Sequence, residues 1–106
     1  MKIANRDARR YVQSRREFTG NNIVAVHRRR DDLYAVFSYG THWPLFIYVG
    51  GLWYENSDKC SPATSKHHTQ CHPLCDTVRL DVAHMVTLAL YGGYDELVRR
   101  RMGVAA

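Results

Sequence analysis

The sequence contains no apolar run near the roughly 20 residues that a membrane-spanning helix needs. Its opening residues, MKIANRDARR, lack the apolar centre of a signal peptide. The three cysteines are an odd number, which does not suit a closed disulfide framework. These absences argue against a membrane partner and against a secreted, disulfide-rich scaffold. They predict a protein of the cytoplasm, where thiols stay reduced.

Proline is also scarce, and no repeat, low-complexity segment or interdomain linker interrupts the chain. A length of 106 residues, 45% of them hydrophobic, is enough to bury one modest core without disulfides. We therefore expect a single globular domain over residues 1–106.

Positive charge is concentrated at the two ends of the chain. Residues 1–30 have a net charge of +7, residues 31–98 have −5, and the run at 99–101 adds +3. Basic clusters of this kind indicate a surface for nucleic acid or for an acidic protein partner. The candidate contact residues from this reasoning are Arg6, Arg9, Arg10, Arg16, Arg28, Arg29, Arg30, Arg99, Arg100 and Arg101.

Hydrophobic periodicity predicts an α+β fold. A basic helix is expected over residues 6–17, then antiparallel strands at 23–28, 33–39, 43–49 and from 52. A short strand at 77–80 precedes a helix that Asp81 caps, and a basic helix at 94–102 ends the chain. The fold prediction is a three- or four-stranded antiparallel sheet, with the basic N-terminal helix and one or two C-terminal helices packed on it.

Residues 55–76 show neither helical nor strand periodicity, so a long irregular loop is expected there. The loop holds all three cysteines, which could supply thiolates to a zinc ion, with a histidine as fourth ligand. The candidate ligands are Cys60, Cys71, Cys75 and either His67 or His72. The spacing lacks a second close Cys/His pair, so a metal-free loop with idle thiols stays open.

The same loop contains Ser65, Lys66, His67 and Gln70, which offer hydroxyl, ammonium, imidazole and amide groups. Such groups can bind a phosphate or a carboxylate. They could also assemble a nucleophile with a base. A third interpretation is that they only satisfy backbone groups of the sheet.

Three sequence blocks resemble a family of small uncharacterised proteins encoded by bacteriophages, prophages and plasmids. They are SYGTHWPLFIY at 38–48, WYENSDK at 53–59 and TSKHHTQ at 64–70, and FTGNN at 18–22 resembles a fourth motif. Cys60, Cys71 and Cys75 lie outside these motifs. The resemblance implies a mobile-element setting, where small proteins often act on host defence or transcription, including as anti-CRISPR proteins.

Charge and resemblance together predict a non-enzymatic, anti-CRISPR-like inhibitor that binds a host protein or ribonucleoprotein complex through basic surfaces. One alternative is a small nucleic-acid-binding regulator, with or without a structural zinc ion. A second alternative is an enzyme that uses the Ser65-Lys66-His67 segment.

Overall fold

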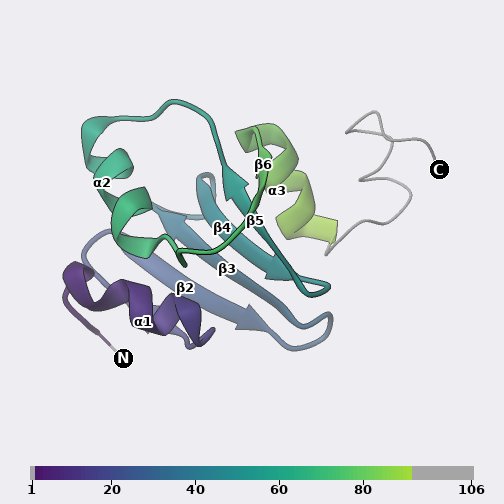
Figure 1. Ribbon diagram of the computed structural model, residues 1–106, viewed down its shortest axis with the longest axis horizontal. Helices are drawn as coiled ribbons and strands as arrows, with labels where there is room; N and C mark the ends of the chain where they lie inside the picture. Colours follow the sequence, from purple (N-terminus) through teal and green to yellow (C-terminus); the bar gives the residue numbers. More distant parts are fainter. Residues whose placement is uncertain (1, 92–106) are drawn as a thin grey trace.

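The computed structural model describes residues 2–91, which form one mixed sheet with helices on both faces (Figure 1). The predicted helix at 94–102, with Arg99, Arg100 and Arg101, lies outside these residues. In chain order the elements are the 3-10 helix η1 (Asn5–Asp7), α1 (Ala8–Gln13), β1 (Phe18–Thr19), β2 (Ile23–Arg28), β3 (Leu33–Ser38), β4 (Pro44–Val49), β5 (Leu52–Asn56), α2 (Pro62–Cys71), β6 (Val78–Leu80) and α3 (Val82–Tyr91).

The predicted α+β class is confirmed, but the predicted sheet is too small and is not purely antiparallel. Six strands lie side by side in chain order, β1-β2-β3-β4-β5-β6. β1 is a strand that was not among those predicted, with Phe18 opposite Ala25 of β2. β6 runs parallel to β5, because α2 carries the chain back along the sheet between them.

One face of the sheet is covered by α1 and α2. β3 and β4 lie at its centre and are buried along nearly their whole length, as strands with both faces covered must be. The buried residues on the α1–α2 side are Ala8, Tyr11, Val12, Phe18, Ile23, Ala25, Tyr34, Val36, Leu45, Phe46, Trp53 and Cys71.

The opposite face is covered by α3, which lies over β4 and β5 (Figure 1). Met85 and Leu88 are fully buried there, against Ile47 and Tyr54 among others. The backbone N–H of His84 donates to the Asp81 carboxylate at 2.8 Å, which confirms the predicted N-terminal cap.

The N-terminal helix is shorter than predicted. Regular α structure ends at Gln13, and Arg15 takes a left-handed conformation with φ of 54°. This reversal turns the chain back into β1. Periodicity alone extends the helix to residue 17, because exposed polar residues at 14–17 do not contradict a helical pattern.

The largest correction concerns the expected loop at 55–76, which contains the ten-residue helix α2. Ser61 is its N-cap and accepts a hydrogen bond from the Thr64 backbone N–H at 3.2 Å. Pro62 occupies the first turn, where a missing N–H costs nothing. The buried residues of α2 are Thr64, His67 and Cys71, which share one helical face but are not a recognisable apolar stripe.

Candidate functional site

Arg9 has a structural role. Its Nε–H donates to the His72 carbonyl at 2.9 Å, and Nη2 donates to the Thr69 carbonyl at 2.7 Å. These are unsatisfied carbonyls at the C-terminal end of α2, where the helix dipole favours a cation. Arg9 therefore ties α1 to α2, and its role as a contact residue stays a prediction.

Three other arginines gather at the C-terminal end of α1. The guanidinium carbons of Arg10 and Arg16 lie 5.6 and 4.8 Å from the centre of the Tyr11 ring. That of Arg15 lies 4.5 Å from the centre of the Tyr48 ring. We call Arg10, Arg15 and Arg16 the arginine surface. All three are exposed, and within residues 2–91 none of them has a carboxylate at ion-pair distance.

The predicted basic residues of the β2–β3 turn are in a different electrostatic setting. Arg28 forms two hydrogen bonds with the Asp31 carboxylate, at 2.9 and 2.7 Å, which hold the pKa of Asp31 below its usual range. Arg29 and Arg30 are exposed beside this pair and beside Asp32. Arg6 is exposed in η1, which precedes the N-terminal end of α1, whereas the arginine surface lies at the C-terminal end. The structure thus divides the predicted basic set into separate groups.

The polar face of α2 contacts the end of β3. Ser38 Oγ lies 2.8 Å from His67 Nδ1 and 3.2 Å from Thr64 Oγ1, and Ser61 Oγ continues the chain to Thr64 at 3.2 Å. Ser38 is almost completely buried. Burial is the main reason that the pKa of His67 is lowered, with Lys66 a second cause, so the ring is neutral at pH 7.

The protons of this hydroxyl chain can point in either direction. When Ser38 donates to His67 Nδ1, the ring carries its proton on Nε2, and when Ser38 donates to Thr64, Nε2 is an acceptor. In both states the bond to Ser38 fixes the ring.

His67 also lines a pocket of about 330 Å³, here called the α2 pocket. The pocket lies between α2, η1 and the turn that joins β1 to β2. Its lining residues are Asn5, Asn21, Ala63, Lys66, His67 and Gln70. The structure therefore brings together three of the four residues predicted from the TSKHHTQ block.

The fourth residue, Ser65, lines a different pocket, so Ser65 and His67 do not share a pocket, and the enzyme alternative stays a prediction. The hydroxyl that meets His67 belongs to Ser38 instead. Sequence spacing could not show this pairing, because the two residues lie 29 positions apart.

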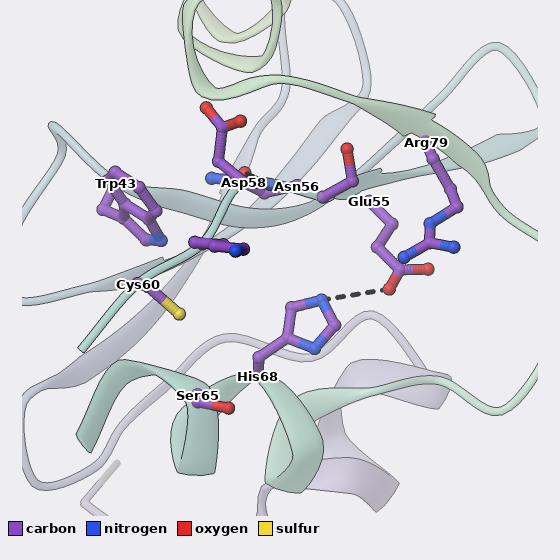
Figure 2. Close-up of a pocket in the computed structure, with 10 residues that line it drawn as sticks. Trp43, Glu55, Asn56, Asp58, Cys60, Ser65, His68 and Arg79 are labelled. Carbon is purple, nitrogen blue, oxygen red and sulfur yellow. Dashed lines mark hydrogen bonds and ion pairs between the residues drawn. The ribbon is translucent and has the colours of Figure 1, made fainter. Parts of the chain in front are cut away.

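Ser65 lines a second pocket of about 340 Å³, shown in Figure 2. One of its lining residues is Glu55, whose carboxylate is buried. Glu55 Oε2 lies 3.1 Å from His68 Nε2, without the geometry of a hydrogen bond. His72 Nε2 lies 3.5 Å from the other oxygen, to which the Thr77 hydroxyl donates at 2.5 Å. Burial lowers the pKa of His68 and outweighs the opposing effect of Glu55. Sequence reasoning missed this cluster, because a lone glutamate in a strand carries no recognisable signal.

The predicted zinc ligands do not come together. Cys71 is buried in the core, whereas Cys60 and Cys75 are exposed at opposite ends of α2, a helix about 15 Å long. His67 contacts Ser38, and His72 contacts Glu55. Among residues 2–91, no three histidine, cysteine or acidic side chains are arranged to hold a metal ion. The zinc alternative therefore loses its ligand set.

No protein-family model, curated protein or solved structure matches this chain. The resemblance to mobile-element proteins stays a prediction. Across the part of the chain that the structure describes, we find no helix with the length and apolar character to span a bilayer.

Proposed function

We propose that this chain is a non-enzymatic binding protein that blocks or modulates a host nucleoprotein complex, in the manner of an anti-CRISPR inhibitor. The arginine surface is its contact with the nucleic acid of that complex. The observation that supports the proposal is the group of three exposed guanidinium groups at the end of α1. The mobile-element setting comes from the sequence resemblance alone.

Phosphate is the partner that this surface suits best. Arginine presents a planar fork of donors that matches phosphate oxygens, and it is weakly hydrated. The guanidinium groups lie over the rings of Tyr11 and Tyr48. Because these contacts already restrict the arginine side chains, less conformational entropy is lost when they bind a phosphate. None of the three arginines forms an ion pair within the described residues, in contrast to Arg28 with Asp31.

The test compares two double variants with the same change of charge. Arg10→Glu/Arg16→Glu alters the arginine surface, and Arg29→Glu/Arg30→Glu alters the β2–β3 turn as a control. Binding of labelled RNA and DNA strands is measured by fluorescence anisotropy over a series of salt concentrations. Loss of two phosphate contacts should make the negative slope of the logarithm of the binding constant against the logarithm of salt concentration shallower by about 1.4. It should also weaken binding at least about tenfold.

The two parts of the proposal fail in different ways. Equal losses in both variants, or no nucleic-acid binding by the unaltered protein, would remove the arginine surface as the contact. The inhibitory role is tested in bacteria with active CRISPR immunity, scored by phage plaque formation. Expression of the unaltered protein should restore plaques, and expression of Arg10→Glu/Arg16→Glu should not. Full immunity in the presence of the unaltered protein would refute the inhibitory role for that system.

A further inference from the structure

The α2 pocket has a lining that favours an anion. Lys66 is the only charged residue among its lining residues, and no aspartate or glutamate is among them. Asn5 is already engaged, since its side chain pairs with the backbone N–H and carbonyl of Asn21 at 2.7 and 3.0 Å. The polar side chains left to meet a ligand are Lys66, His67 and Gln70, with that of Asn21 at the β1–β2 turn.

His67 is oriented to serve as a donor in this pocket. Its Nδ1 is occupied by Ser38, and no described protein group bonds to Nε2. Ser38 can donate to Nδ1, and in that arrangement the ring carries its proton on Nε2, available to an anion. The neutral ring can adopt this state without taking a proton from solvent.

Gln70 supplies an unexplained polar atom. Its Oε1 is buried and has no hydrogen-bond partner in the described structure. An unsatisfied buried polar atom is costly, so a ligand that bonds to it would be stabilising. If the side chain turned toward the pocket and its amide rotated by half a turn, its N–H groups could donate to an anion there.

A second, more apolar pocket of about 320 Å³ adjoins the first across the β1–β2 turn. Ile23, Val24 and Tyr39 line it, and the Tyr39 ring also lies 5.4 Å from the ring of His67. Tyr39 is 58% exposed and takes a left-handed conformation with φ of 58°. A large side chain rarely occupies this conformation, and strained residues cluster at binding sites.

From these contacts we propose that the paired pockets bind a nucleotide, with its phosphate in the α2 pocket and its base against Tyr39. Lys66, His67 and Gln70 are the phosphate donors, and the exposed tyrosine ring is the stacking surface. A terminal phosphate of a nucleic-acid strand and a free mononucleotide have the same chemistry here.

The inference rests on the proposed function for its ligand class, since both invoke nucleic acid. The two can still fail separately, because none of Arg10, Arg15 and Arg16 lines the α2 pocket or the pocket beside Tyr39. Arg10→Glu/Arg16→Glu should therefore leave mononucleotide affinity within about twofold of the unaltered protein.

The experiment is calorimetric titration of the full chain with three probes: adenosine 5′-monophosphate, adenosine and inorganic phosphate. The monophosphate should bind more tightly than either fragment. Lys66→Gln should weaken it about tenfold, since a charge-assisted contact is lost. Tyr39→Leu should weaken it to a similar extent through loss of stacking. Lys59→Gln is the matched control, because Lys59 is an exposed lysine that lines the pocket of Ser65 and His68 instead of the α2 pocket.

Lys66 is exposed, so its substitution does not endanger the fold, and thermal unfolding of each variant verifies this. Equal affinity in Lys66→Gln and Lys59→Gln would overturn the phosphate site, as would the absence of binding both by the monophosphate and by a terminally phosphorylated strand. Equal binding of adenosine and of its monophosphate would also overturn it. Binding of a terminally phosphorylated strand but not of the mononucleotide would identify the strand end as the source, provided that Lys66→Gln weakens it.

Discussion

Arg9 and Arg10 are adjacent arginines for which the structure predicts opposite roles. Arg9 donates two hydrogen bonds to the last carbonyls of α2, whereas Arg10 is exposed at the arginine surface. Replacing each with methionine keeps most of the unbranched stem and removes the donors. Arg9→Met should therefore lower the stability of the fold, and Arg10→Met should lower nucleic-acid affinity.

The size of the stability loss follows from the contacts of Arg9. Each charge-assisted hydrogen bond is worth about 1.5–3 kcal/mol when well buried. One of these bonds is only partly buried and the other is exposed, so solvent reduces their contribution. The favourable position at the end of the helix adds about 0.5 kcal/mol. We expect a loss of about 2 kcal/mol in the free energy of unfolding, or roughly 10 °C in melting temperature.

The assay is urea unfolding followed by tryptophan fluorescence, since Trp43 and Trp53 are both at least half-buried. Arg10→Met should change the free energy of unfolding by about 0.5 kcal/mol at most, as is usual for an exposed residue. Equal midpoints for Arg9→Met and Arg10→Met would refute the assignment of Arg9 as the tie between the helices. A large loss of nucleic-acid affinity in Arg9→Met alone would reverse the two roles.

Two further predictions concern stability. The pKa of His68 is lowered from 6.5 in the fold, so the unfolded chain takes up the proton first, and the free energy of unfolding should fall as pH drops below about 6.5. Burial raises the pKa of the Cys71 thiol from 9.0 to about 12, so the free energy of unfolding should also fall above about pH 9. Urea unfolding at a series of pH values measures both effects, and a free energy of unfolding that stays constant below pH 6.5 and above pH 9 would contradict them. Leu74→Gly should raise the free energy of unfolding by about 1 kcal/mol, because Leu74 is 64% exposed and takes a left-handed φ of 58°. The control Leu52→Gly, at an exposed position in a strand, should lower it by about the same amount, and equal effects in thermal unfolding would show that backbone strain is absent.

The strands could be predicted from the sequence because they carry strong local signals. Residues 23–28 are rich in β-branched side chains and bounded by polar turns, and they form β2 with the predicted bounds. Asp81 before an apolar helical pattern correctly marks the start of α3. β6 was visible as a short strand, but its parallel direction depends on a crossover helix. With α2 taken for a loop, an all-antiparallel sheet was the consistent prediction.

α2 itself escaped prediction because the residues that it buries are not hydrophobic by type. Thr64, His67 and Cys71 follow helical spacing, but two of them face the sheet through hydrogen bonds rather than apolar contact. One local signal was available, since Ser61 followed by Pro62 is a helix start. The partners of α2, Ser38 and Glu55, come from distant strands, and no sequence spacing relates them to it.

The buried polar face of α2 is itself an argument for function. A helix that only completed the core would pack apolar side chains against Phe46 and Val36. Burying apolar side chains costs less free energy than burying a threonine and a histidine, whose polar groups need hydrogen-bond partners. Instead, α2 presents His67 to one pocket and His68 to another, each held by a residue of the sheet. α2 departs from the usual rule that a packed helix buries apolar side chains, and it does so where it lines two pockets. Such departures are typical of binding sites. If α2 were merely structural, replacing Ser38 and His67 together with apolar residues of similar volume would stabilise the fold and leave nucleotide binding unchanged. Our inference requires instead that binding is lost, whatever the stability becomes.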